Sequence, residues 1–352
     1  MKKSVLRLMV ALLAMSCLLT SCGKTDSEAE PNAGEANKPA ANEEVYTIKL
    51  AHGVSESGPL HLAALVFEER VERESNGKIQ VEISPNSALG NDKQMAEMIQ
   101  MGTLDCGVIP TAKLSGFYAP LQVLDLPFLF VDKEASYEVF DSDEFLSLFE
   151  EDMRNIGFEF LGIWESGFKQ ITSNRMIKTP EDFKGLNVRV MESALLTAQY
   201  KALNANPVTI DFGETYNALQ QGTADAEENP LTSIVNMKFY EVQETMTISN
   251  HGYLACAFLF STNVWEKLPE EYRTLLADAA RDVAEDSRTL NATSEEEYIK
   301  IIEDYGTEIY TLNEEEIAAF VEVMLPVHEE FRDVIGSDIL DTTKELLEEA
   351  MA

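Results

Sequence analysis

Basic side chains are scarce in this sequence of 352 residues, which has 27 Lys and Arg against 62 Asp and Glu and a net charge of −35. Nucleic acid or a bare anionic membrane would be repelled by such a surface, so we exclude nucleic-acid binding. Acidity favours solubility and says nothing about the fold. It does set a condition on function, because a site for an anion must be a local basic island.

Histidine is also rare, and the common catalytic motifs are missing. The four histidines are scattered, and the nearest approach to a zinc-binding HExxH, residues 328–332, lacks the second histidine. GxGxxG, GxxxxGK[ST] and GxSxG do not occur. With 62 carboxylates, pairs at a glycosidase-like spacing would arise by chance. We therefore expect no enzyme, no metal site and no cofactor.

Only four cysteines are present, and two of them lie within the first 22 residues. The other two, Cys106 and Cys256, lie inside apolar runs. A disulfide between them would be stable outside the cytoplasm, but strand cysteines are more often buried and free. We predict two free thiols.

Residues 1–21 have the form of a bacterial lipoprotein signal peptide. Three basic residues precede an apolar stretch, residues 8–19, that is too short to span a bilayer. Leu-Thr-Ser before Cys22 resembles a lipobox, in which the cysteine becomes the lipidated first residue; a plain signal peptide is the alternative. Cleavage there removes three basic residues and no acid, so the net charge moves from −35 to −38. Residues 22–44 are expected to be a flexible tether.

The remaining sequence alternates between strand and helix patterns. Strands are predicted at residues 45–52, 78–83 and 104–109, and amphipathic helices at 59–74 and 92–101. Short connections between such elements indicate a parallel α/β sheet. The chain length suggests about two lobes.

The same order repeats later in the chain. Residues 100–105 (QMGTLD) are similar to residues 220–225 (QQGTAD), and each Gly is placed to end a helix just before a strand. The pattern predicts two related lobes. Residues 270–305 contain no Gly or Pro, which favours one helix of about 54 Å over two helices broken near residues 291–293.

Short motifs recur in a recognisable order: LGND at 89–92, LPFLF at 126–130, NVRV at 187–190 and ENP at 228–230, all within residues 46–345. Together they resemble the DctP-type solute-binding proteins of tripartite ATP-independent periplasmic (TRAP) transporters. The resemblance implies a two-lobed α/β fold like that of periplasmic binding proteins, with a hinge and a long helix spanning both lobes. It implies no enzymatic activity.

We expect one lobe from residues 45–166 with about 255–294, and the other from 167–254 with about 295–352. The predicted hinge lies near Glu165–Gly167, beside Tyr253–Cys256.

The resemblance implies capture of an organic acid and its delivery to an ion-gradient-driven TRAP permease. A sugar acid such as a uronate or aldonate is favoured, and a C4-dicarboxylate comes next. We expect a monomer, lipid-anchored at the extracytoplasmic face of the bacterial cell membrane or free in the periplasm. The alternatives are a ligand-sensing protein for a receptor ectodomain and a lipid-anchored hydrolase.

Arg189 is the leading site candidate. Apolar residues alternate along Leu186–Val190, so Arg189 is predicted to face away from the core, where it would ordinarily be solvated. The resemblance implies instead that it pairs with the substrate carboxylate, for which a planar guanidinium is well shaped. It would then supply the basic island that the acidic chain requires.

The resemblance also implies contacts from Asn229, whose amide can donate and accept. Lys169 falls where many relatives carry a second Arg, so its contact would be longer or water-mediated. Phe212 packs either on the ligand or in the core, and Trp164 is expected to wall the cleft.

Four residues of the first lobe follow predicted strands, at the edge where open α/β sheets place their ligands. A network of substrate hydroxyls would suit these polar side chains, although each is also common as a helix cap or loop residue. They are His52, Asn91, Asp92 and Thr111.

Overall fold

The computed structural model describes residues 45–352. The predicted signal peptide, the lipidation site Cys22 and the tether therefore lie outside the described residues. Within residues 45–352, none of the helices combines the length and apolar character that crossing a membrane requires.

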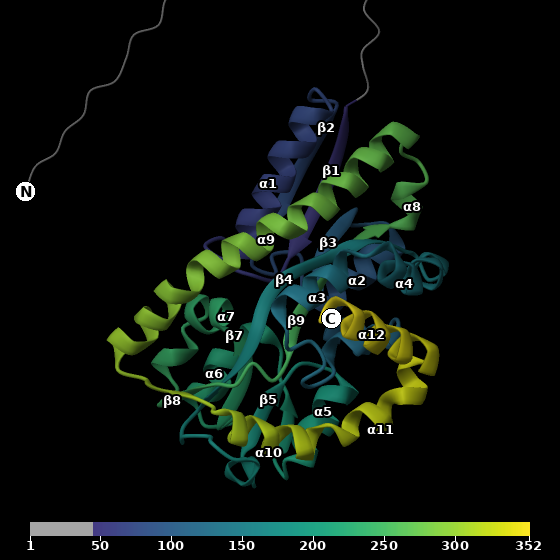
Figure 1. The fold of residues 1–352 in the computed structure, drawn as a ribbon. Helices are drawn as coiled ribbons and strands as arrows, with labels where there is room; N and C mark the ends of the chain where they lie inside the picture. Colours follow the sequence, from purple (N-terminus) through teal and green to yellow (C-terminus); the bar gives the residue numbers. More distant parts are fainter. Residues whose placement is uncertain (1–44) are drawn as a thin grey trace, which may run out of the picture. The chain divides into compact units, whose positions relative to one another are not determined.

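In the part of the chain that the structure describes, eight strands form a continuous path with the order β2-β1-β3-β9-β4-β7-β5-β6, and β8 and β10 pair with each other outside it, with β8 also paired to β4 (Figure 1). We call the part around β1, β2 and β3 the first lobe and the part around β5, β6 and β7 the second lobe. The first lobe contains β1 (Tyr46–His52), β2 (Ile79–Ser84) and β3 (Cys106–Pro110). The second contains β5 (Asn187–Val190), β6 (Asn206–Thr209) and β7 (Ala226–Pro230). The remaining strands are β4 (Phe158–Ser173), β8 (Thr245–Ile248), β9 (Tyr253–Ser261) and β10 (Glu308–Thr311).

Helices fill the connections. Before β4 come α1 (Pro59–Glu74), α2 (Asp92–Met101), the 3₁₀ segments η1 (Thr111–Leu114) and η2 (Ala119–Asp125), α3 (Lys133–Asp141) and α4 (Asp143–Asn155). Between β4 and β8 come η3 (Pro180–Phe183), α5 (Ala194–Ala202), η4 (Phe212–Glu214), α6 (Thr215–Gln220), α7 (Leu231–Asn236) and η5 (Phe239–Glu241). The chain ends with α8 (Thr262–Trp265), α9 (Glu270–Tyr305), α10 (Glu314–Met324), α11 (Pro326–Ile335) and α12 (Ser337–Ala350).

The predicted repeat of two related lobes is confirmed. The order β2-β1-β3 on one side matches β6-β5-β7 on the other, with parallel pairing in each lobe. Each triplet then meets an antiparallel strand, β9 in one lobe and β4 in the other. The two repeated glycines, Gly102 and Gly222, both adopt left-handed φ values, 75° and 69°.

The long helix is also confirmed. α9 runs unbroken for 36 residues and packs on α1 of the first lobe, on β4 and on α7 of the second lobe (Figure 1). Its weakest helix formers carry side-chain bonds that fit the helix: Thr293 Oγ1 donates to the Thr289 carbonyl at 3.0 Å, and Asn291 Nδ2 donates to Glu165 Oε1 at 3.2 Å. The bond from Asn291 to β4 is a tertiary contact, and such packing contacts support a helix where intrinsic propensity is low.

The C-terminal helices differ from the expected division into lobes. We assigned residues 295–352 to the second lobe, but α12 packs on α3 and α4, and α11 packs on η2 as well as on α5. These helices are amphipathic, with buried apolar residues such as Leu340 and Leu347 that complete the large core cluster. The end of the chain therefore covers elements of both lobes.

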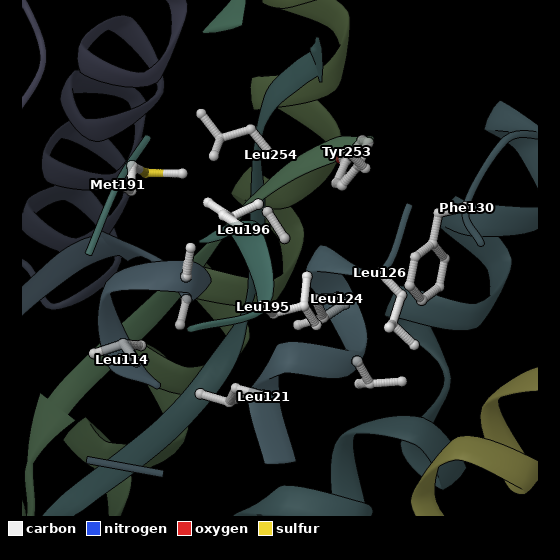
Figure 2. Packing of buried hydrophobic residues seen from close by; sticks show 14 of the residues in the cluster. Leu114, Leu121, Leu124, Leu126, Phe130, Met191, Leu195, Leu196, Tyr253 and Leu254 are labelled. Atoms are coloured by element: carbon white, nitrogen blue, oxygen red, sulfur yellow. The ribbon is translucent and has the colours of Figure 1, made fainter. Parts of the chain in front are cut away.

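The same core cluster joins the lobes. Leu121 and Leu124 from η2 lie in it with Leu195 and Leu196 from α5 (Figure 2). Cys106 and Cys256, on the neighbouring strands β3 and β9, are buried and free, as predicted.

The two repeated glycines allow a matched stability test. A Cβ at Gly222 would meet no atom within 4 Å, so Gly222→Ala costs only the left-handed backbone strain, about 1 kcal/mol. A Cβ at Gly102 would lie 3.1 Å from Asn263 Cβ, so we expect Gly102→Ala to cost about 2 kcal/mol or more. Urea unfolding of the two variants measures the difference, and equal losses would contradict this account.

Candidate functional site

A small buried cavity lies between the lobes, with a volume of about 30 Å³. It is lined from the first lobe by residues that follow β1 and β3 or begin α2, among them Gly53, Val54, Asp92 and Pro110. The second lobe contributes Met191, Phe212, Asn229 and Ser233. These positions lie at or just beyond the carboxyl ends of parallel strands, where open α/β sheets bind ligands.

Arg189 is buried next to this edge, with 1 % of its surface exposed, and it is not among the residues that line the cavity. Its Nε donates to the Ile210 carbonyl at 3.0 Å, whereas its buried Nη2 has no hydrogen-bond partner among the described residues. Burial lowers the pKa of Arg189, and the nearby carboxylates of Glu227, Glu228 and Asp92 act in the opposite direction. One side of the guanidinium is therefore fixed while another nitrogen still needs an acceptor.

The strand pattern was wrong about the surroundings of Arg189. Alternation predicted a side chain facing away from the core, but Val188, Arg189 and Val190 are all buried. β5 is paired along both edges, with β6 and β7, and the burial of consecutive side chains shows that both of its faces are covered as well.

Carboxyl groups near Arg189 have altered acidity. Burial raises the pKa of Glu227 to about 7, although Thr172 and Asn229 donate to its oxygens at 2.8 and 2.5 Å. Burial also raises the pKa of Asp92, against the influence of Lys113 and Arg189. Both groups are therefore weaker acids than exposed carboxyl groups, and of the two only Asp92 lines the cavity.

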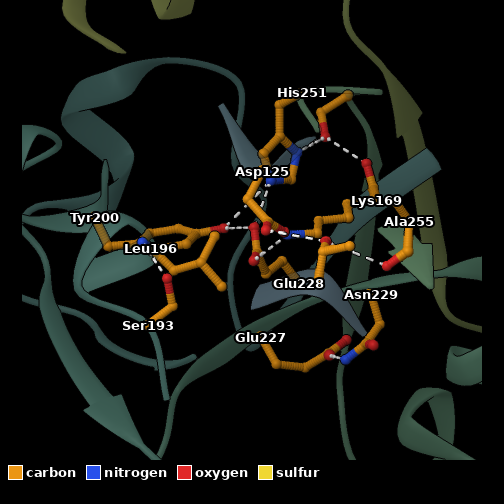
Figure 3. A network of polar contacts seen from close by, with 12 residues as sticks. Asp125, Lys169, Ser193, Leu196, Tyr200, Glu227, Glu228, Asn229, His251 and Ala255 are labelled. Atoms are coloured by element: carbon orange, nitrogen blue, oxygen red, sulfur yellow. Dashed lines mark hydrogen bonds and ion pairs between the residues drawn. The ribbon is translucent and has the colours of Figure 1, made fainter. Parts of the chain in front are cut away.

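Lys169 belongs to a different buried network, drawn in Figure 3. Its Nζ lies 3.0 Å from Glu228 Oε1, while Tyr200 OH and His251 Nε2 lie 2.9 and 2.8 Å from Glu228 Oε2. Burial alone would raise the pKa of Glu228, but Lys169 and His251 hold it well below its usual range. Lys169 is thus committed to Glu228 and does not line the cavity.

Three first-lobe candidates make internal contacts instead of lining the cavity. His52 Nε2 lies 3.1 Å from His61 Nδ1, and Thr111 Oγ1 donates to Asp125 Oδ2 at 3.1 Å. Asn91 caps α2 in a capping box. Of the four first-lobe candidates, Asp92 alone lines the cavity.

Of the two aromatic candidates, one lines the cavity and the other does not. Phe212 lines the cavity and packs edge-on against Phe239, with ring centroids 6.1 Å apart. Trp164 is fully buried beneath α9, where its Nε1 donates to the Ala280 carbonyl at 2.8 Å. We therefore remove Trp164 from the candidate ligand contacts.

The sequence reasoning missed Lys113. This residue lies in η1, two positions after Thr111, and only 8 % of it is exposed. Its Nζ lies 3.8 Å from Asp211 Oδ1, and its charge acts on both Asp92 and Arg189. The available signal was a basic residue just after a strand, at the edge where Thr111 was already a candidate.

Polar contacts join the lobes around this cavity. They are Ser57 Oγ to Asn236 Oδ1 (2.8 Å), Asn91 Nδ2 to Asp211 Oδ2 (3.1 Å), Lys93 Nζ to Glu192 Oε1 (3.1 Å) and Lys113 Nζ to Asp211 Oδ1 (3.8 Å). The lobes are therefore in contact in this conformation.

Comparison with known proteins identifies the family. The sequence profile of the bacterial extracellular solute-binding protein family 7 (DctP) matches residues 50–333. The chain belongs to this family. It is a TRAP solute-binding protein of DctP type, extracytoplasmic and not an enzyme, as the resemblance implied.

Individual relatives bind different organic acids. The C4-dicarboxylate-binding periplasmic protein DctP of Rhodobacter capsulatus is 35% identical over 307 residues, which is 86% of this chain and 91% of the relative. A TRAP protein from Sulfurospirillum deleyianum with bound succinate is 35% identical, with a TM-score of 0.80 and coverage of 86% and 99%. The sugar acid binding protein of Advenella mimigardefordensis in complex with galactonate is 29% identical, with a TM-score of 0.83 and coverage of 87% and 99%.

His52 gives a testable dependence of stability on pH. Burial and the neighbouring His61 lower its pKa from 6.5 to about 4 in the folded protein. Between these values the unfolded chain binds the proton better, so this stabilisation is present above pH 6.5 and is lost as the pH falls towards 4. In urea unfolding, we expect the advantage of the unmodified protein over His52→Gln to shrink by about 3 kcal/mol from pH 7 to pH 4. Asp125 and Glu227 also have raised pKa values, but both proteins contain them, so their contributions cancel in the stability difference. A stability difference that stays the same from pH 7 to pH 4 would contradict this prediction.

Proposed function

We propose that this protein captures a C4-dicarboxylate between its lobes and delivers it to an ion-gradient-driven TRAP permease. The observation that carries the proposal is Arg189, a buried cation with an unpartnered Nη2 in a strongly acidic chain. A carboxylate suits it, because guanidinium presents parallel N–H groups. Burial strengthens the pairing, since little water screens it.

A second cation supports a ligand with two acidic groups. Lys113 comes from the first lobe and Arg189 from the second, and both act electrostatically on Asp92 at the cavity wall. A dicarboxylate long enough to reach both would bind well only when the lobes meet. Such differential contacts favour the closed state.

The relatives support the same class. The R. capsulatus protein is named for C4-dicarboxylates, and the S. deleyianum structure holds succinate. We therefore place C4-dicarboxylates ahead of the sugar acids that the sequence alone favoured. A sugar acid is the second candidate, because the Advenella structure holds galactonate and because Asp92 can accept a hydrogen bond from a ligand hydroxyl.

Capture requires the lobes to separate. A cavity of about 30 Å³ is far smaller than the roughly 300 Å³ or more of typical ligand sites. The proposed hinge lies where β4 pairs with β9, at the register shift between Glu165 and Gly167. Gly167 has a φ of 115°, a conformation that favours glycine.

Delivery is proposed to occur at the membrane. The lipobox-like end of the signal peptide supports lipidation of Cys22, and the tether predicted at residues 22–44 would keep a monomeric binding domain close to its permease. The expected alternative of a lipid-anchored hydrolase is dropped, because the family consists of binding proteins.

Arg189→Ala tests the principal contact. Removing a buried partner of a carboxylate should cost about 3–5 kcal/mol of binding free energy, measured by calorimetry with succinate. Arg189→Lys keeps the charge but loses the fork, so an intermediate affinity is expected. Arg175→Ala is the control, because Arg175 is exposed and bonds the carbonyls of Asp182 and Lys184. Unchanged succinate affinity in correctly folded Arg189→Ala would contradict the role.

Lys113→Gln tests the ligand class. The unmodified protein should prefer succinate over its monoamide, succinamate, by about tenfold or more, because a charged hydrogen bond is lost. In Lys113→Gln this preference should fall towards unity, while galactonate affinity changes little. A clear preference for galactonate over both C4 acids in the unmodified protein would replace the C4-dicarboxylate with a sugar acid.

A further inference from the structure

A second, larger hollow lies beside the buried cavity. This groove of about 1000 Å³ is lined by the start of α2, by η1 and η2, by α5 and by α11. Its charged lining residues are Lys93, Lys113, Lys201, Glu192 and Glu330. We call it the lysine groove.

The lysine groove departs from the charge balance of the chain. Its lining carries three Lys and two Glu, whereas the whole sequence has 27 basic against 62 acidic residues. α5 also begins at the groove, with Ala194 and Thr197 in its lining. Backbone N–H groups at a helix start add partial positive charge. An anion near this acidic protein therefore meets a local positive region at the groove.

The groove and the buried cavity share a boundary made by consecutive residues. Asp92 lines the cavity and Lys93 lines the groove; across the gap, Met191 lines the cavity and Glu192 lines the groove. The ion pair between Lys93 and Glu192 crosses this boundary from one lobe to the other, at 3.1 Å. We call this boundary the seam.

A second acidic residue of the second lobe acts at the same place. Asp211 accepts from Asn91 at 3.1 Å and lies 3.8 Å from Lys113, both in the first lobe. Two groove lysines are thus held across the seam by two second-lobe carboxylates. Within residues 45–352, Lys201 has no such cross-lobe partner, and it is exposed on the last turn of α5.

We propose that the lysine groove is the entrance at which an organic anion is first captured, that Glu192 takes over Lys93 as the lobes close, and that Asp211 shares Lys113 with the bound ligand. The inference rests on the proposed function, because it needs an anionic ligand. Opening the seam frees both lysines to attract the anion. Closing it pairs Lys93 with Glu192, which frees the anion to reach Arg189 and holds the lobes together, while Lys113 keeps the second carboxylate of the ligand beside Asp211.

The physical basis is that an approaching anion responds mainly to the charges close to it and much less to the net charge of the whole protein. At physiological salt, charges beyond about 8 Å are largely screened. The distant carboxylates therefore repel an approaching dianion less than the groove lysines attract it. Clefts lined by one sign of charge raise association rates, whereas contacts formed on closing mainly affect dissociation.

The capture role of the groove and the closing role of the seam affect different rate constants, which stopped-flow binding of succinate measures. Lys201→Gln should lower the association rate about threefold at low salt, with dissociation unchanged, and the effect should vanish at 1 M salt. The double variant Glu192→Gln/Asp211→Asn should raise the dissociation rate about threefold without slowing association.

Matched controls remove the effect of net charge. Lys300→Gln changes the total charge as Lys201→Gln does, but Lys300 lies exposed on α9 outside the groove lining. Glu285→Gln/Glu296→Gln, also on α9, matches the acidic double variant. Equal association rates in Lys201→Gln and Lys300→Gln, or an unchanged dissociation rate in the seam double variant, would overturn the inference.

Failure of the proposed function would look different. If succinate, succinamate and galactonate all fail to bind the unmodified protein, the proposed function and this inference are both rejected. If succinate does not bind but galactonate does, the same variants are measured with galactonate, and the same outcomes decide. If succinate or galactonate binds but Lys201→Gln leaves the association rate unchanged, only the inference about the lysine groove is rejected.

Discussion

The structure depends on one buried cation that the protein only partly compensates. Arg189 has four carboxylates in its surroundings, and three of them are weakened as partners. Glu228 is committed to Lys169 and His251, and burial raises the pKa of Glu227 to about 7 and that of Asp92 as well. Removing a charge from water is costly unless a partner replaces the lost hydration. The unpartnered Nη2 of Arg189 is therefore the observation on which the proposed binding of an external anion rests, inside a chain whose net charge is −35.

The repeated strand order of the two lobes shows that only the second lobe has an Arg at this position of the sheet. Strand pairing sets Leu50 opposite Cys106 in the first lobe and Val188 opposite Ala226 in the second. Since Cys106 and Ala226 begin the repeated strands, Ala51 occupies the position equivalent to Arg189. The first lobe has an alanine at that position, and its buried cation Lys113 comes instead from η1, the segment after β3. In the proposed complex the two lobes therefore offer unlike partners to a ligand, one fixed within a sheet and one at its edge.

Much of the fold could be predicted from local sequence patterns, whereas the features that were missed depend on contacts between residues far apart in the chain. The run without Gly or Pro predicted both ends of α9 correctly, and the two repeated glycines indicated the related lobes. Alternation failed at Arg189, because period two assumes one open face and β5 has none. The fate of Lys169 depended on Glu228, 59 residues away, which no local pattern reveals. α12 returns to α3 and α4 for a similar reason, since its apolar face indicates burial but not the surface that buries it.

Trp164 shows how one such long-range bond changes the view of the hinge. The β4–β9 pairing shifts register twice, between Phe160 and Gly162 and between Glu165 and Gly167, and Trp164 lies between the shifts. Its bond to the Ala280 carbonyl fixes this stretch to α9, as does the bond from Glu165 N to Ser287 Oγ at 3.2 Å. In the opening motion that we propose, the lobes rotate at the two glycines, whose φ values of 146° and 115° are strained for other residues. In that proposal α9 is a rigid support, because its contacts hold the strand between the two glycines while each lobe turns beyond them.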